Sequence, residues 1–142
     1  MNVEIRRLHR GDDALVMRLA DDVFDEPVRL DRLAAYLASP GHFMIVAIVD
    51  QIVVGQCAAV IHRHPDKVSE LYIDEVGVAP PFQRQGIARR MLDAMFEIGR
   101  AHGCEEAWVG TEPDNEPARA LYETRKESHG EAEDFVMYVY RL

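Results

Sequence analysis

The sequence predicts one mixed α/β domain, from its length and from the order of its segments. The chain has 142 residues, of which 48% are hydrophobic and 29% charged, and this composition suits a single domain with a substantial apolar core. Segments with strand and helix patterns follow one another in the order strands, helix, strand, helix, strand, which is typical of a mixed α/β architecture. We therefore treat residues 1–142 as one domain.

The amino-terminal half is expected to form three strands and two helices. Alternating apolar and polar residues predict a strand over 3–8, and apolar residues at three- and four-residue spacing predict a helix over 14–24. A second helix is expected over 29–38, where a Ser-Pro-Gly sequence ends it. Two apolar, β-branched runs at 43–49 and 52–61 then predict a hairpin of core strands.

The carboxyl-terminal half is expected to add three strands and two helices. A wide apolar face predicts a long helix over 87–103, with Gly103 as its terminal cap. A short helix is expected over 117–124, because Pro117 suits a first turn. The three strands are expected at 70–78, 107–110 and 135–140.

The charge of the chain restricts its partners. There are 16 basic and 25 acidic residues, which give a net charge of −9. This balance disfavours nucleic acid and anionic membranes as partners, since both require a basic surface, and it favours a cationic substrate. No apolar run approaches the roughly 20 residues that cross a bilayer, and the amino terminus lacks the hydrophobic stretch of a signal peptide. We therefore expect a cytoplasmic protein.

The cysteines and the paired histidines are not expected to form a metal site. Cys57 and Cys104 lack metal-ligand spacing and are expected to be reduced structural thiols. His62 and His64 form an H-x-H pair in a predicted polar loop, a pattern that can bind metal. Because no third ligand is near them in the sequence, we expect solvated histidines and no metal.

A phosphate-binding loop is predicted at 83–88, with the sequence Q-R-Q-G-I-A. Gly86 and Ala88 stand where a strand has ended and a helix begins, and such a junction offers free backbone N–H groups and the positive end of the helix dipole. On spacing alone, Gly86 could also simply ease a loop into a helix. A local positive patch could be formed by Arg84, Arg89 and Arg90.

The surrounding run, V-G-V-A-P-P-F-Q-R-Q-G-I-A, resembles the acyl-CoA motif of the GNAT superfamily of N-acetyltransferases. That motif is Gln or Arg, two residues, Gly, one residue, then Gly or Ala, and its positions are filled here by Gln83, Gly86 and Ala88. A second family segment, N-x-x-A-x-x-L-Y, is matched by Asn115, Ala118, Leu121 and Tyr122. The resemblance implies the GNAT fold, with a mixed, mostly antiparallel central sheet of six to seven strands flanked by about four helices.

The resemblance also implies an acetyl-CoA site. In the family, the amides of this loop hold the pyrophosphate and the end of the preceding strand pairs with the pantetheine arm. Tyr122 would protonate the departing thiolate, or else be a half-buried aromatic anchor, and Asn115 would bind pantetheine or cap its helix. The residues expected at the coenzyme are Val76, Val78, Gln83, Arg84, Gln85, Gly86, Ile87, Ala88, Arg89, Asn115, Ala118 and Tyr122.

Asp74 and Glu75 are the candidate catalytic bases. Acidic side chains in an otherwise apolar strand are costly to bury unless they are used or paired. Alternation would place Tyr72 and Asp74 on one face and Ile73 and Glu75 on the other, unless a bulge near Gly77 changes the parity. By resemblance, polyamine-acetylating relatives favour Asp74 and aminoglycoside-acetylating relatives favour Glu75. A structural salt bridge is the alternative for each carboxylate.

Further acidic residues are expected at the acceptor. The cluster Asp21, Asp22, Asp25 and Glu26 follows the first predicted helix, which borders the acceptor groove in the GNAT fold. A solvated acidic face is the alternative. The residues expected to contact the acceptor are Asp21, Asp25, Glu26, Tyr72, Asp74, Glu75, Glu112 and Asp114.

The runs S-E-L-Y-I-D-E-V-G-V and A-R-A-L-Y and the ending D-F-V-M-Y most resemble aminoglycoside 3-N-acetyltransferases. The resemblance implies direct transfer of acetyl from acetyl-CoA to the 3-amino group of deoxystreptamine in a ternary complex, drug resistance, and a homodimer. The alternatives are acetylation of another amine (a polyamine, an amino sugar or a protein amino terminus) and a non-catalytic acyl-CoA-binding domain. Relatives carry a glycine about four residues after the motif tyrosine, where T-R-K-E stands at 124–127, so an altered turn is expected there.

Overall fold

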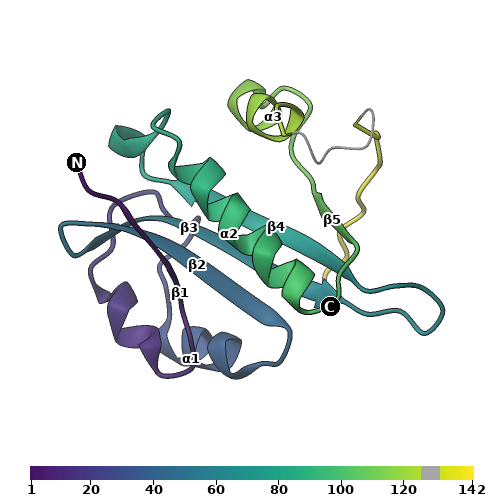
Figure 1. Ribbon diagram of the computed structural model, residues 1–142, viewed down its shortest axis with the longest axis horizontal. Helices are drawn as coiled ribbons and strands as arrows, with labels where there is room; N and C mark the ends of the chain where they lie inside the picture. Colours follow the sequence, from purple (N-terminus) through teal and green to yellow (C-terminus); the bar gives the residue numbers. More distant parts are fainter. Residues whose placement is uncertain (126–131) are drawn as a thin grey trace. The chain divides into compact units, whose positions relative to one another are not determined.

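The computed structural model describes residues 1–125 and 132–142 (Figure 1). The described chain divides into two compact units, Met1–Gly110 and Thr111–Leu142. The larger unit contains the whole sheet, and the smaller unit contains one helix. The expectation that residues 1–142 form one domain stays a prediction.

A single mixed sheet forms the centre of the larger unit (Figure 1). Its strands lie in sequence order; the first three pairings are antiparallel and the last is parallel. This confirms a mixed, mostly antiparallel sheet, but the described residues contain five strands rather than six to seven. The strands are β1 (Glu4–Arg7), β2 (His42–Val49), β3 (Ile52–His62), β4 (Glu70–Val78) and β5 (Glu106–Val109).

Three α-helices and two short 3₁₀ helices accompany the sheet in the described part of the chain. The helices predicted over 29–38, 87–103 and 117–124 are confirmed within two residues at each end. None of the described helices is long and apolar enough to span a bilayer. The elements are η1 (Asp12–Met17), α1 (Leu30–Ala38), η2 (Pro80–Phe82), α2 (Ile87–Ala101) and α3 (Glu116–Glu123).

The sheet of the larger unit is covered on both faces. Alternation along β3 puts Gly55 and Ala58 on opposite faces of the sheet. On one face, a Cβ on Gly55 would lie 3.1 Å from Met91 of α2. On the other face, Ala58 belongs to a core cluster that includes Leu33 of α1. Met91 and Met95 of α2 are fully buried. Two apolar layers therefore enclose β2, β3 and β4.

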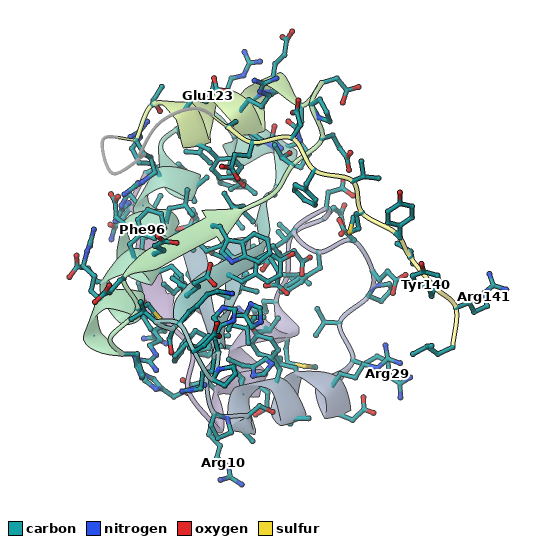
Figure 2. The ribbon with its side chains drawn as sticks, turned by 90° about the vertical axis from the view of Figure 1, so that its right-hand side faces the viewer. Arg10, Arg29, Phe96, Glu123, Tyr140 and Arg141 are labelled. Atoms are coloured by element: carbon teal, nitrogen blue, oxygen red, sulfur yellow. The ribbon has the colours of Figure 1, made fainter. Side chains whose placement is uncertain are left out.

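Helix α1 is anchored to the sheet by Tyr36. The tyrosine hydroxyl lies 2.8 Å from the carbonyl oxygen of Phe43 and 3.2 Å from that of Ala59, so it can donate to either strand. At the amino end of the helix, Arg29 forms two hydrogen bonds with the carboxylate of Asp31 and points away from the sheet (Figure 2). The helix thus presents its apolar side inward and its charged end to solvent.

The predicted helix over 14–24 is wrong beyond Met17. The next residues instead run beside β3, where the N–H of Ala20 donates to the carbonyl of Val53 at 2.9 Å and the N–H of Val53 donates to the carbonyl of Arg18 at 2.8 Å. These bonds use the backbone groups that a helix would need. Apolar side chains of the segment are still buried, which explains why their spacing suggested a helix.

The predicted strand over 135–140 is also wrong, because residues 132–142 contain neither helix nor strand. Their apolar, β-branched composition gives β-propensity, but a strand also needs a neighbour to complete its backbone hydrogen bonds. No strand in the described part of the chain pairs with this segment. The altered turn expected at 124–127 falls partly on 126–131, outside the described residues.

Candidate active site

The predicted phosphate loop joins β4 to α2 and has an unusual backbone. Gly86 directly precedes α2 with φ of +79°, and Arg84 has φ of +60°. A non-glycine residue rarely adopts this left-handed conformation, and strained residues of this kind cluster at ligand sites. The first backbone N–H of the helix that donates to a preceding carbonyl is that of Arg90, which donates to the carbonyl of Gly86 at 3.1 Å. The amides before it are therefore those available to an anion.

Glycine is required at position 86 by conformation rather than by packing. A Cβ built on Gly86 would meet no atom within 4 Å. The space in front of the loop is therefore open, and a phosphate group can approach the main chain of Gly86, Ile87 and Ala88 closely. This arrangement supports the predicted pyrophosphate cradle.

The two glutamines of the motif shape the loop with their side chains. Nε2 of Gln83 donates to the carbonyl of Val78 at 3.0 Å, and Nε2 of Gln85 donates to the carbonyl of Pro81 at 3.3 Å. These bonds tie the loop to the end of β4 and to the residues between. Arg90, expected in the positive patch, instead donates to the carbonyl of Val3 at 3.1 Å.

The second half of β4 has an open edge. Strand β5 pairs only with residues Glu70–Ile73, and no other described strand lies beside Val76 and Val78 on that side. On the opposite side these two valines pair with β3. Unpaired backbone groups at a strand edge can accept an extended ligand as an additional strand. The edge thus matches the position predicted for the pantetheine arm.

A β-bulge reshapes β4 at the candidate bases. Ala58 of β3 lies opposite Glu75, and the next residue, Ala59, lies opposite Ile73. Asp74 is therefore an extra residue without a partner in the ladder. Such a bulge adds one residue to a strand and reverses the facing of every side chain beyond it.

The bulge corrects the predicted parity of the strand. It lies at Asp74 rather than near Gly77. Cross-strand partners share a face, so Glu75 lies on the face of Ala58, and Tyr72 lies there too through its partner Val60. The pairing of Glu75 with Ile73 on one face was therefore wrong, and Glu75 and Tyr72 face the same side.

Glu75 occupies an environment that favours its protonated form. Burial raises the pKa of this carboxyl, and the carboxylates of Asp25 and Asp74 raise it further, while a hydrogen bond from Gln56 acts in the opposite direction. Gln56 is fully buried, and its Nε2 also lies 3.4 Å from the carbonyl of Val23. A carboxylate with a raised pKa is suited to accept a proton near neutral pH.

Asp74 has a similar but more exposed setting. Burial raises the pKa of Asp74, and the nearby imidazole of His42 lowers it. No ion pair joins Asp74 or Glu75 to a basic side chain within residues 1–125 and 132–142. The described structure therefore gives no support to a structural salt bridge as the reason for these two acids.

An aromatic pair lies on the same face as Glu75. Tyr72 stacks on Trp108 of β5, with ring centroids 4.1 Å apart and an interplanar angle of 19°. Trp108 is 41% exposed although it is a large apolar residue. Sequence analysis missed this residue, since only the register of β4 and β5 brings it opposite Tyr72.

The acidic cluster lines a surface hollow beside β4. The hollow is formed by residues 19–27, has a volume of about 280 Å³, and includes the carboxylates of Asp21, Asp22, Asp25 and Glu26. The segment that forms the hollow lies very close to β4, since a Cβ on Gly77 would be 2.4 Å from the carbonyl oxygen of Val23. The acidic cluster thus lines a hollow formed by an irregular segment rather than by the end of a helix, and its role toward the acceptor stays a prediction.

A match between the sequence and a protein-family model identifies the family to which these features point. Residues 10–126 match the model of the acetyltransferase (GNAT) family. The chain belongs to this family. It is therefore an acetyl-CoA-dependent N-acetyltransferase, as the motif at the phosphate loop predicts. No curated protein matches the sequence.

Solved structures share the fold of this acetyltransferase over its whole length. The aminoglycoside acetyltransferase meta-AAC0020, from an uncultured soil metagenomic sample and solved with sisomicin, is 20% identical with a TM-score of 0.80, covering 98% of this chain and 97% of that one. AAC(6')-Iy, solved with the bisubstrate analogue CoA-S-monomethyl-acetylneamine, is 20% identical with a TM-score of 0.80 and full coverage of both chains. Ribosomal-protein-alanine N-acetyltransferase from Brucella melitensis biovar Abortus 2308 is 19% identical with a TM-score of 0.72, covering 99% and 100%. Such identities show the common fold and leave the acceptor open.

The second motif of the acetyltransferase lies in the smaller unit. Asn115 caps α3, since its Oδ1 accepts a hydrogen bond from the N–H of Ala118 at 3.1 Å. Tyr122 lies on the same helix and is partly buried, while Glu112 and Asp114 are exposed just before it. The capping role of Asn115 is confirmed, and the roles of these residues toward coenzyme and acceptor stay predictions.

The cysteines of the acetyltransferase are both free, as predicted. Burial raises the pKa of Cys57 to about 12 and also raises the pKa of Cys104. Thiols with raised pKa values stay protonated at neutral pH and are poor nucleophiles.

Proposed function

We propose that this acetyltransferase transfers the acetyl group of acetyl-CoA to an amino group of an aminoglycoside, with the 3-amino group of deoxystreptamine as the expected position. The observation that carries the proposal is the acidic acceptor face. Glu75, with its raised pKa, lies close enough to Asp25 for that carboxylate to act on it, and Asp25 lines the hollow. A polycationic acceptor would be attracted by such a surface.

The reaction follows from these groups. An ammonium group of the acceptor gives its proton to Glu75, directly or through one water, and becomes a neutral amine. The amine nitrogen attacks the thioester carbonyl, and the tetrahedral intermediate collapses with cleavage of the carbon–sulfur bond. Tyr122 protonates the thiolate of coenzyme A as it leaves, and the surplus proton on the attacking nitrogen passes through water to the resulting tyrosinate. Glu75 is proposed as the base, and Asp74 is expected to contribute charge to the acceptor site.

The aromatic pair supports a sugar-like acceptor. Trp108 is 41% exposed and stacks on the half-buried Tyr72, on the face that carries Glu75. Aromatic faces attract cations and pack against the apolar faces of sugar rings. An amino sugar combines both features, whereas a linear polyamine uses only the first.

The test is acetyl-CoA-dependent thiol release measured against a panel of amines. The panel contains gentamicin, sisomicin, spermidine, glucosamine and a peptide with a free amino terminus. We expect the highest kcat/KM with the two aminoglycosides, and acetylation at the 3-amino group when the product is examined by NMR. Turnover confined to another amine would replace the proposed acceptor, and binding of acetyl-CoA without any turnover would favour the non-catalytic alternative.

The homodimer implied by the resemblance is part of the same proposal. Light scattering on the purified chain would test it, with a mass near twice 16.1 kDa as the expected result. A mass of one chain would remove the dimer and leave the proposed reaction unaffected.

A further inference from the structure

The far end of the β3–β4 hairpin holds a cluster of ligand-type side chains. His62, the last residue of β3, lies directly opposite Glu70, the first residue of β4. Residues opposite each other in an antiparallel pair have Cβ atoms roughly 5 Å apart. His64 follows two residues after His62 at the start of the connecting loop. The fold thus supplies the third ligand that the H-x-H pair lacks in the sequence.

The three side chains converge on one point. One ligand atom of each (a ring nitrogen of each histidine and a carboxylate oxygen of Glu70) lies within 4.8 Å of the other two. The rings of His62 and His64 have centroids 4.3 Å apart. Nε2 of His64 is in contact with Oε1 of Glu70. The hydrogen bond between His64 and Glu70 explains why those two side chains lie close together, but it does not explain why His62 also lies beside them.

We propose that His62, His64 and Glu70 form a binding site for a divalent transition-metal ion, with Zn²⁺ as the ion best suited to it. Two imidazoles and one carboxylate are a donor set that Zn²⁺ accepts, whereas Ca²⁺ and Mg²⁺ prefer oxygen ligands alone. In a tetrahedral zinc site the ligand atoms are roughly 3.3 Å apart. The three ligand atoms lie within 4.8 Å of one another, and rotation of the side chains would have to close the remaining difference. A water completes the coordination.

The surroundings suit an ion that enters from solvent. His62 is exposed, while the side chains of His64 and Glu70 are 16% and 26% exposed, so one side of the cluster is open and the other is sheltered. Arg63 stands between the two histidines in the sequence, but its side chain extends toward Gly41. Its Nη1 would lie 2.9 Å from a Cβ built on that glycine. Its positive charge is therefore directed away from the cluster.

The site is structural rather than part of the acetyl transfer. Glu70 and Glu75 are five residues apart on β4, which corresponds to roughly 15 Å along an extended strand. An ion held by His62 and Glu70 joins the end of one strand to the start of the next. It would therefore fasten the hairpin that carries Glu75 without taking part in the chemistry.

The test uses the full-length chain without a histidine tag, treated with EDTA and then dialysed. ZnCl₂ is titrated by calorimetry, and CoCl₂ is titrated with visible absorption, since Co²⁺ in a tetrahedral site absorbs strongly. We expect one ion per chain and a higher melting temperature with Zn²⁺, because a ligand that binds only the folded state stabilises it. His62→Ala, His64→Ala and Glu70→Gln should each weaken binding by about 100-fold or more, since even loss of an outer partner costs 10–100-fold.

His9→Ala is the matched control, because His9 is an exposed histidine outside the cluster. It should bind Zn²⁺ as the unaltered chain does. His62→Ala changes an exposed side chain, and a circular dichroism spectrum would establish that this variant is folded. Absence of stoichiometric binding would overturn the proposal. Equal affinity in the His9 and His62 variants would do the same.

Discussion

The proposed coenzyme half and the proposed acceptor half of this acetyltransferase differ in the groups that form them. The coenzyme half is mostly backbone, namely the open edge of β4, the left-handed residues Arg84 and Gly86, and the first turn of α2. The acceptor half is mostly side chains, brought together from residues 19–27, β3 and β4. Backbone sites recognise what all acetyl-CoA enzymes share, while side-chain sites can change with the acceptor.

The largest expected effect comes from removing the proposed base. Glu75→Gln keeps the size of the side chain and should lower kcat by about 100-fold or more, in line with the contribution of a positioned general base. Asp74→Asn should cost much less. Steady-state kinetics with acetyl-CoA and an aminoglycoside would measure both, and the reverse order would make Asp74 the base.

Thermal unfolding separates this role from a structural one. Burial raises the pKa of Glu75, so ionisation of Glu75 at pH values above its ordinary range destabilises the folded state. A neutral glutamine removes that cost, and the melting temperature at pH 7 should be unchanged or higher. A clear fall would indicate that Glu75 holds the fold together. Glu4→Gln, on the opposite edge strand of the sheet, is the control and should leave kcat unchanged.

Tyr122→Phe should have the second largest effect, with kcat lowered by about tenfold and the affinity for acetyl-CoA nearly unchanged. Protonation of the departing thiolate contributes less than deprotonation of the amine, because a thiol is already a fair acid with a pKa of about 8.5. The split between kcat and KM in steady-state kinetics is the measurement. An unchanged kcat would remove Tyr122 from the mechanism.

Gly86→Ala tests the backbone half, and Gly103→Ala is its matched control. The two glycines stand at opposite ends of α2 with φ of +79° and +80°, and a Cβ on either would meet nothing within 4 Å. Each alanine should destabilise the fold by about 1 kcal/mol through backbone strain alone. Only Gly86→Ala should raise the KM for acetyl-CoA, by about fivefold, because its new methyl group stands where phosphate approaches. Equal KM values in the two variants would contradict the cradle.

The smallest effect is a shift in the pH dependence of turnover. The rising limb of kcat/KM against pH reports the pKa of the base in the free enzyme. The carboxylate of Asp25 raises the pKa of Glu75, so Asp25→Asn should move this limb to lower pH. A limb at unchanged pH would show that Asp25 does not act on the base.

Gln56→Leu should move the same limb in the opposite direction. The hydrogen bond from Gln56 lowers the pKa of Glu75, and leucine cannot form it. Oε1 of Gln56 is buried without a hydrogen-bond partner in the described structure. Leucine removes this unpaired oxygen but also leaves the carbonyl of Val23 and the carboxyl of Glu75 without their donor, so the folded state should lose about 1–3 kcal/mol of stability. Opposite shifts in the two variants would identify Glu75 as the titrating group.

The backbone of the proposed coenzyme half could be predicted because its determinants are adjacent in the sequence. The strand over 70–78 and the loop glycine Gly86 were located correctly from the pattern alone. Asn115 was likewise identified as a helix cap, since a cap acts on residues two or three positions away. Local sequence dictates local backbone in all of these cases.

The acceptor half could not be predicted because its determinants are distant in the sequence. Residues 18–20 leave the helical pattern to bond with Val53, a partner more than thirty positions away. The bulge at Asp74 depends on the match between β3 and β4, and it reverses the side to which Glu75 points. Trp108 meets Tyr72 only through strand register. No short stretch of the sequence contains both partners of any of these contacts.

Gly77 has a consequence for how the acceptor range of such an enzyme could change. Because a Cβ at this position would lie 2.4 Å from the carbonyl oxygen of Val23, even alanine must displace the segment that walls the hollow. One nucleotide substitution would thus reshape the hollow while Asp74 and Glu75 are both retained. Position 77 is therefore a rational first target for saturation mutagenesis, with variants screened on amines that the parent enzyme acetylates poorly.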